Sequence, residues 1–268
     1  MEILIYFLIF IFGLIIGSFL NSIIHRLSIK KDFLFGKSQC PSCNHVLSWY
    51  DLIPLISFLI LRGKCHYCKK PISAQYPLVE FMTGALFVLL TWQNIDLLAS
   101  NALFGFLRLC FLFLISCFLI IIFVYDFKHY IIPDKVIFPA IFIIGSWYLL
   151  ASIIFDFYTK NNMLNGLYSA LGASLFFLFI VLVSQGKWMG MGDVKLAFFM
   201  GLFLGFPKII TALFLAFFIG AVIGVILIFS GKKGLKSEIP FGPFLVAGTF
   251  LTLFFEHEII NFYLSVYY

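Results

Sequence analysis

The chain has 268 residues, of which 63% are hydrophobic, 20% aromatic and only 11% charged. A soluble domain of average composition carries about 25% charged residues, so this composition excludes a globular protein whose whole surface faces water. The formal net charge of +6 is compatible with an anionic partner, but the positions of the basic residues indicate a membrane topology instead. We therefore expect membrane lipid, and no nucleic acid, as a partner.

Apolar runs of about 20 residues recur along the chain, and this is the length that an α-helix needs to cross a bilayer. The runs are continuous rather than alternating, which favours helices over a β-barrel. We expect an all-α polytopic membrane protein with about eight transmembrane helices. The predicted spans are 3–24, 78–93, 102–124, 136–155, 166–184, 195–206, 209–229 and 241–257.

The loops between these spans fall into two sets with very different numbers of basic residues. One set holds 15 of the 18 Lys and Arg residues and consists of 25–77, 125–135, 185–194 with Lys195 at its edge, and 230–240. Cytoplasmic loops collect Lys and Arg, so this set is predicted to be cytoplasmic and both termini periplasmic. No basic residue precedes the first run, which is expected to be an uncleaved span rather than a signal peptide.

The spans divide the chain into three predicted parts. Residues 1–24 form the first transmembrane helix, 25–77 a small cytoplasmic domain, and 78–268 the membrane core. The cytoplasmic domain contains an apolar stretch, Leu52 to Ile60, that is about half as long as a span. We interpret this stretch either as the core of the domain or as a segment lying on the membrane surface.

Two Cys-x-x-Cys pairs lie in this cytoplasmic domain. They are Cys40-Pro-Ser-Cys43 and Cys65-His-Tyr-Cys68, a spacing typical of a four-thiolate zinc site. The cytoplasm disfavours disulfides, which supports a metal over crosslinks, although four reduced thiols without metal are the alternative. Because four thiolates leave no open coordination position, the predicted Zn²⁺ is structural.

Two aspartates lie at the predicted cytoplasmic ends of spans. Asp126 closes the third span, and Asp193 follows two glycines, Gly190 and Gly192, just before the sixth. Two carboxylates a few ångströms apart share one proton, and such a pair can hydrolyse a peptide with one acid and one base. The glycines allow a helix end to unwind and a substrate backbone to approach. The two positions are therefore compatible with a catalytic dyad.

Charged residues at such boundaries also have ordinary structural roles. An aspartate can cap a helix or pair with a nearby lysine, and Lys195 is kept as a supporting candidate for this reason. Asp134 is predicted to begin the fourth helix. Glu80 lies inside the second span, where a charge is costly, so it is a further supporting candidate that faces the bundle interior or a cytoplasmic groove.

Six motifs, occurring in order, resemble the type IV prepilin leader peptidases, a family of GxGD membrane aspartyl proteases. They are GSFLNSIIHRL (17–27), CPSC with SWYDLIPLISFLILRGKCHYCKKPIS, YPLVE (76–80), YDFKHYIIPD, GMGDVK and IPFGPFLVAG (239–248). The resemblance implies that Asp126 and Asp193 are the catalytic pair. It implies cleavage of the short basic leaders of prepilins and pilin-like secretion subunits, the pseudopilins, at the bacterial inner membrane.

The resemblance also implies a second activity, because family members with the cysteine domain methylate the new amino terminus with S-adenosylmethionine. The chain has no glycine-rich nucleotide loop, so this expectation depends on the resemblance alone. Gly63 in the RGKC segment is the candidate for cofactor binding. We also considered a presenilin-like intramembrane protease, which shares Tyr-Asp and GxGD but not the cysteine domain. A transporter or channel would place acids at mid-membrane in repeated halves, which the sequence does not show.

Overall fold

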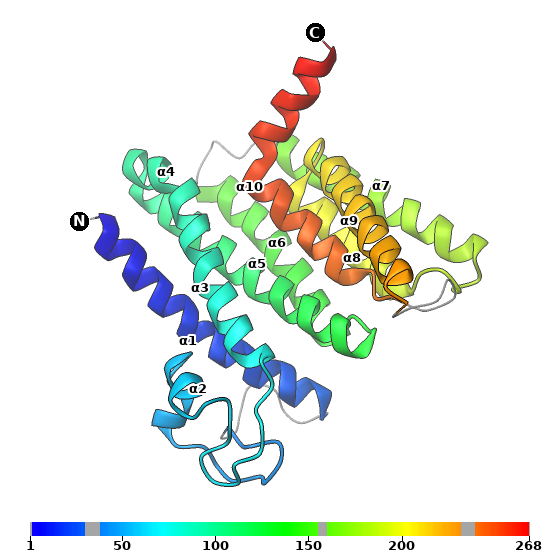
Figure 1. Ribbon diagram of the computed structural model, residues 1–268. Helices are drawn as coiled ribbons and strands as arrows, with labels where there is room; N and C mark the ends of the chain where they lie inside the picture. The colour runs from blue at the N-terminus through cyan, green and yellow to red at the C-terminus, as the bar shows by residue number, and fades with distance from the viewer. Residues whose placement is uncertain (1, 30–37, 155–159, 232–238, 268) are drawn as a thin grey trace. The chain divides into compact units, whose positions relative to one another are not determined.

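The computed structural model describes residues 2–29, 38–154, 160–231 and 239–267 (Figure 1). These residues contain no β-strand, only two isolated bridges in the cysteine domain. The helices are α1 (Glu2–Ser28), a 3₁₀ turn η1 (Trp49–Leu52), α2 (Ile56–Ile60), α3 (Gln75–Gln93), α4 (Ile95–Ser100), α5 (Ala102–His129), α6 (Asp134–Ile154), α7 (Lys160–Val183), α8 (Met191–Leu204), α9 (Lys208–Phe229) and α10 (Gly242–Tyr267).

The predicted all-α membrane fold is confirmed. A helix occupies most of each of the eight predicted spans. Among the described residues, five helices are long and apolar enough to cross a membrane, namely α1, α5, α6, α7 and α9. The helices at the other three predicted spans are α3, α8 and α10. Of these, α3 has 19 residues and does not meet the same criteria. The apolar part of α10, Gly242–Phe255, is shorter, and α8 has only 14 residues, so α8 and α10 need neighbouring protein to cover their ends.

The chain forms two compact units, Met1–Ile121 and Ile122–Tyr268. In the first unit, α1 and α3 pack as an antiparallel pair whose contacts recur every four residues. A Cβ on Gly13 would lie 2.6 Å from the Cα of Gly84, and a Cβ on Gly17 would lie 2.7 Å from the Cα of Glu80. One turn further, the Asn21 side chain donates to a main-chain carbonyl of α3. Small residues therefore set the close spacing of this pair.

The second unit is built on close helix pairs around α8. A Cβ on Gly201 of α8 would lie 2.5 Å from the Cα of Ala170 in α7, so these backbones are in contact. The hydroxyl of Tyr148 in α6 donates to the Leu202 carbonyl at 3.0 Å, which ties α6 to the same helix. In α10, a Cβ on Gly248 would overlap the α9 backbone. These contacts fix the carboxyl-terminal half of α8 against α6 and α7.

Candidate functional site

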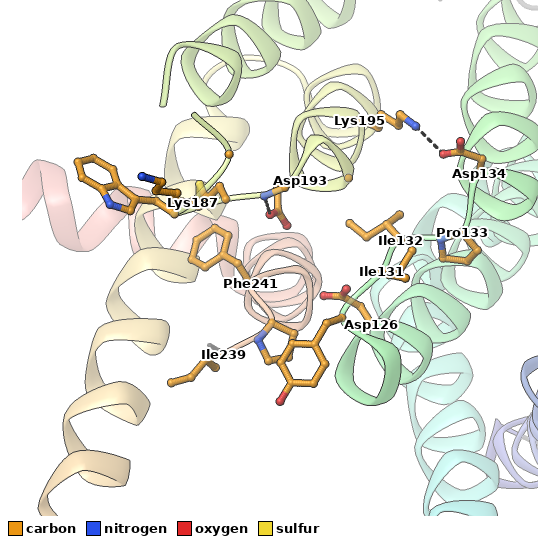
Figure 2. Close-up of a pocket in the computed structure, with 17 residues that line it drawn as sticks. Asp126, Ile131, Ile132, Pro133, Asp134, Lys187, Asp193, Lys195, Ile239 and Phe241 are labelled. Atoms are coloured by element: carbon orange, nitrogen blue, oxygen red, sulfur yellow. Dashed lines mark hydrogen bonds and ion pairs between the residues drawn. The ribbon is translucent and has the colours of Figure 1, made fainter. Parts of the chain in front are cut away.

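The second unit contains a cavity of about 580 Å³ that opens at the ends of its helices (Figure 2). Three segments line it. They are the last turn of α5 with the turn that leads into α6, the residues before α8 with its first turn, and Ile239–Phe241 just before α10. All three segments come from loops that the sequence assigns to one side of the membrane. The structure thus brings together loops of the strongly basic set.

Asp126 lies in the last turn of α5 and is only 5% exposed. Its carboxylate accepts a hydrogen bond from the backbone N–H of Gly242, the first residue of α10. A Cβ on Gly242 would overlap the Oδ2 atom of Asp126 and lie 3.0 Å from its Cγ. Only glycine at this position therefore allows the α10 backbone to reach the carboxylate in the observed position.

Asp193 is the third residue of α8 and is 9% exposed. Its Oδ2 atom accepts a hydrogen bond from the N–H of Gly190 at 3.3 Å. Gly190 is the residue that caps the helix, so Asp193 also satisfies an amide that the helix leaves without a partner. The positive end of the helix dipole favours a carboxylate at this position. Capping and catalysis are compatible here, because one oxygen is enough for the cap.

The two glycines before Asp193 differ in surroundings. A Cβ on Gly190 would meet only the backbone nitrogen of Gly192, at 3.8 Å. A Cβ on Gly192 would lie 3.2 Å from the Cβ of Ile132, a buried residue in the turn between α5 and α6. Gly192 therefore permits close packing of the α8 start against the segment that follows Asp126.

The two carboxylates face the same cavity from different helices, as Figure 2 shows. They are near enough to interact electrostatically. Each is held by a backbone N–H from a different segment, and both are largely removed from water. Two buried carboxyl groups that face one cavity can share a proton and polarise one water molecule.

Lys195 points away from the two acids. Its ammonium lies 2.6 Å from Oδ1 of Asp134 and 5.3 Å from the centre of the Phe138 ring. Asp134 is the first residue of α6, as predicted, and the ion pair joins the starts of α6 and α8. Both partners line the cavity, but the Asp134 side chain is 59% exposed. Lys195 thus positions a helix end and does not contact the dyad.

The sequence did not single out several residues that line this cavity or adjoin its acids. Gly242 is the most important, since it contacts Asp126 directly. Ile132 and Phe241 supply apolar walls on either side of the acids in Figure 2. All three occur in motifs recognised from the sequence, YDFKHYIIPD and IPFGPFLVAG. The motifs were the available signal, but they do not say which member touches a carboxylate.

Glu80 has its contacts in the first unit. It is buried, and its Oε2 atom accepts a hydrogen bond from the N–H of Leu55 at 2.9 Å. The side chain of Ser18 in α1 also bonds to it. Glu80 is not among the residues that line the cavity with the two aspartates. Its observed contacts attach the cysteine domain to α1 and α3.

The four cysteines of the predicted metal site come together. Their sulfur atoms all lie within 4.8 Å of one another, and those of Cys40 and Cys68 are 4.0 Å apart. Sulfurs around one zinc at ~2.3 Å lie roughly 3.8 Å apart, so the cluster fits a tetrahedral metal. The four residues are Cys40, Cys43, Cys65 and Cys68.

The two knuckles have the same backbone turn. In the first, Cys40 N donates to the His45 carbonyl at 3.0 Å, and Asn44 N donates to the Cys40 carbonyl at 2.9 Å. In the second, Cys65 N donates to the Lys70 carbonyl at 2.9 Å, and Lys69 N donates to that of Cys65 at 3.0 Å. The residue after each second cysteine has positive φ, 56° and 58°. Two equivalent turns present two sulfurs each.

The thiols of the first knuckle differ in acidity. Burial raises the pKa of Cys40, but backbone hydrogen bonds from Ser42 and Cys43 and bonds to neighbouring thiols prevail and lower that pKa to about 7. The backbone hydrogen bond from His45 lowers the pKa of Cys43, but desolvation and the hydrogen bonds with the Cys40 and Cys68 thiols prevail and raise that pKa to about 11. Of these two thiols, Cys40 therefore forms the metal-binding thiolate more readily.

Gly63, the candidate for cofactor binding, has a clear backbone role. Its φ is +68°, its N–H donates to the Phe58 carbonyl at 2.9 Å, and its carbonyl accepts from Ile72 N at 2.7 Å. A Cβ there would lie 3.1 Å from the Phe58 ring. Gly63 thus joins the end of α2 to the second knuckle, which requires glycine whether or not a cofactor binds nearby.

Comparison with known proteins adds independent evidence. Residues 11–94 match the model of the bacterial peptidase A24 N-terminal domain, and residues 112–225 match that of the type IV leader peptidase family. No solved structure matches the chain.

Full-length relatives agree with these family matches. A Bacillus subtilis (strain 168) protein is 30% identical over 97% of this chain and 98% of its own length. A Stutzerimonas stutzeri protein is 32% identical over 95% and 92%, and an Aeromonas hydrophila protein is 31% identical over 96% and 93%. Each of the three is named prepilin leader peptidase/N-methyltransferase.

Proposed function

This chain belongs to the type IV leader peptidase family, and we propose that it uses Asp126 and Asp193 to cleave the leaders of prepilins and pseudopilins. It is an aspartic endopeptidase that also N-methylates the new amino terminus, as the names of its relatives indicate. The assignment of the two residues depends on their geometry. Two buried carboxylates from separate helices face one cavity, and each is oriented by a backbone N–H.

In the proposed reaction, the two carboxyl groups hold one water molecule between them. The ionised carboxylate takes a proton from this water as its oxygen attacks the scissile carbonyl carbon, and the protonated one donates a proton to the carbonyl oxygen. Collapse of the tetrahedral intermediate breaks the C–N bond, and the leaving amine takes a proton from the acid pair. The apolar walls formed by Ile132 and Phe241 limit access of bulk water.

Location at one membrane face suits this substrate class. The chain is a multi-pass protein of the bacterial inner membrane. We propose that the three segments that line the cavity are cytoplasmic and both termini periplasmic, because the loops in question carry most of the basic residues. A prepilin would then keep its hydrophobic helix in the bilayer and present its basic leader at the cytoplasmic face.

The cysteine cluster would hold a structural Zn²⁺ through Cys40, Cys43, Cys65 and Cys68. The metal would join the two knuckles and stabilise the domain, since four thiolates leave no position for a substrate. S-adenosylmethionine would supply the methyl group for the second activity. Family membership supports that cosubstrate, and no described residue is assigned to it. The domain bounds, 1–24, 25–77 and 78–268, remain part of this proposal.

Substitution of the two acids tests the peptidase assignment. Asp126→Asn and Asp193→Asn keep the shape of the side chains but cannot share a proton, so each is expected to abolish leader cleavage. Asp134→Asn is the matched control, because this acid lines the same cavity but is exposed and paired with Lys195. The variants are co-expressed with a prepilin, and the mass of the mature amino terminus reports cleavage and methylation together.

The control separates the possible outcomes. Loss of cleavage in the two dyad variants with near-normal cleavage in Asp134→Asn supports the assignment. Wild-type-like cleavage in either Asp126→Asn or Asp193→Asn would remove the mechanism. Membrane insertion of each variant is checked from its amount in the membrane fraction.

A further inference from the structure

An apolar surface of the cysteine domain has no role in the proposed chemistry. It is formed by η1, α2 and their flanks, and its most exposed side chains are Trp49 at 79%, Ile60 at 74% and Leu59 at 72%. Ile56 is 55% exposed. The sequence left open whether this stretch is the core of the domain or lies on the membrane. Side chains this exposed do not form a core, and a patch of this kind marks an interaction surface.

A hydrogen bond fixes how deep this surface lies relative to the membrane helices. The N–H of Leu55, just before α2, donates to Glu80, which lies opposite Gly17 of α1. Gly17 is seven residues before Ile24, where the apolar run of α1 ends. At 1.5 Å per residue, Gly17 lies about 10 Å inside that end. Leu55 is thus held beside the apolar part of α1 and α3.

The backbone at Leu55 shows that this position is imposed. Its φ and ψ are 58° and −48°, a conformation that a leucine adopts only when its surroundings hold it there. The hydrogen bond from Leu55 N–H to the buried Glu80 carboxylate keeps the backbone in this conformation. Because α1 and α3 are fixed by close glycine contacts, the segment cannot move away from the helices without breaking this bond.

The charges around the surface suit an anionic bilayer. Exposed basic residues follow the apolar stretch, namely Arg62, Lys64, Lys69 and Lys70. Residues 38–74 contain a single acidic residue, Asp51. Its side chain is only 4% exposed and is bonded to His66 and Tyr67. The surface therefore combines exposed Trp, Leu and Ile with exposed cations and no exposed carboxylate, the composition of an interfacial membrane anchor.

We propose that the exposed face of residues 49–60 inserts into the cytoplasmic leaflet of the membrane, continuous with the lipid-facing surfaces of α1 and α3. Trp49, Leu59 and Ile60 lie at the boundary of headgroups and acyl chains, and the basic residues contact anionic headgroups. Glu80 is the positioning residue that holds the anchor at this depth. The cysteine domain is thereby kept against the bilayer, where a substrate amino terminus leaves the membrane.

Quenching of Trp49 fluorescence by lipid tests this proposal without any need for enzymatic activity. The full chain has four tryptophans, and the Trp92→Phe, Trp147→Phe, Trp188→Phe variant retains only Trp49. It is reconstituted in phosphatidylcholine–phosphatidylglycerol vesicles that carry bromine either near the headgroup or near the acyl-chain end. Shallow bromine is expected to lower Trp49 emission about twofold or more, and deep bromine less, as for an interfacial side chain.

A charged pair of substitutions supplies the second measurement. In the same background, Leu59→Glu with Ile60→Glu is expected to reduce lipid quenching and to increase quenching by aqueous iodide, whereas the matched Leu59→Ala with Ile60→Ala changes both less. Protein-bound zinc checks that the cysteine domain remains folded.

Three results would overturn the proposal. If iodide quenches Trp49 and brominated lipid does not, the side chain lies in water. Protection that grows with the ratio of protein to lipid indicates a second copy of the chain as the occupant. Protection that occurs only after a prepilin is added indicates a substrate surface.

Discussion

Replacement of Gly242 by alanine tests how the site is assembled, because this glycine was not predicted to touch a catalytic group. The added Cβ would overlap Oδ2 of Asp126 and lie 3.0 Å from its Cγ. The carboxylate has to move, or the start of α10 has to move, and either shift lengthens the bond from the Gly242 N–H to Asp126. The perturbation adds one methyl group and removes no donor or acceptor.

The size of the effect can be estimated in two ways. A hydrogen bond to a charged group contributes about 1.5–3 kcal/mol, and each ~1.4 kcal/mol corresponds to a factor of ten in rate. Loss of this bond in the transition state would thus lower kcat/KM by roughly 10- to 150-fold. A displacement of a reacting group by about 1 Å costs on the order of 100-fold. Both estimates predict a decrease of about 100-fold, mainly in kcat.

The assay is cleavage of a reconstituted prepilin by purified protein in vesicles, with kcat and KM measured separately. Gly145→Ala is the matched control, because a Cβ on this glycine of α6 would meet nothing within 4 Å, and it should retain full activity. The reasoning fails if Gly242→Ala cleaves with wild-type kcat/KM. A thermal unfolding curve similar to that of the wild type would show that a lower rate reflects the site rather than unfolding.

Three other changes are expected to act away from the dyad. Cys65→Ser should lower the amount of bound zinc, measured by atomic absorption, and the melting temperature of the cysteine domain. Its effect on cleavage should be smaller, and an unchanged zinc content would contradict the four-thiolate site. Gly201→Val should destabilise the second unit by about 1–3 kcal/mol, since even a Cβ would lie 2.5 Å from the Cα of Ala170. Unaltered thermal stability would show that α7 and α8 can separate without cost. Lys195→Met should cost less than about 1 kcal/mol, because its pair with Asp134 is largely exposed, and loss of cleavage as complete as in the dyad variants would show that the pair does more than position α8.

Much of the fold could be predicted from local sequence. Whether a stretch of chain can span a bilayer depends on its own length and hydropathy, and a helix is found at the place of each predicted span. The four cysteines could also be grouped correctly, since each pair is contained in one short turn and the spacing of the pairs is typical of zinc sites. The family was evident because its motifs lie in order along the chain.

The environment of each charged group could not be predicted in this way. Lys195, two residues from Asp193, pairs instead with Asp134 of another helix. Glu80, considered for the peptidase site, instead bonds to Leu55 of the cysteine domain. The reason is that a side-chain partner depends on which helices adjoin and how they are rotated, and hydropathy and spacing within a segment do not specify either.

The sequence by itself determined that the chain is a helical membrane protein with a basic side, a four-cysteine domain and two acids at span ends. Only the tertiary structure decided that Asp126 and Asp193 share a cavity, that Gly242 supplies an N–H to one of them, and that residues 49–60 expose their apolar side chains. Hydropathy and charge are properties of each segment alone. A cavity, a hydrogen-bond donor from another helix and an exposed face arise from the packing of segments that are distant in the sequence.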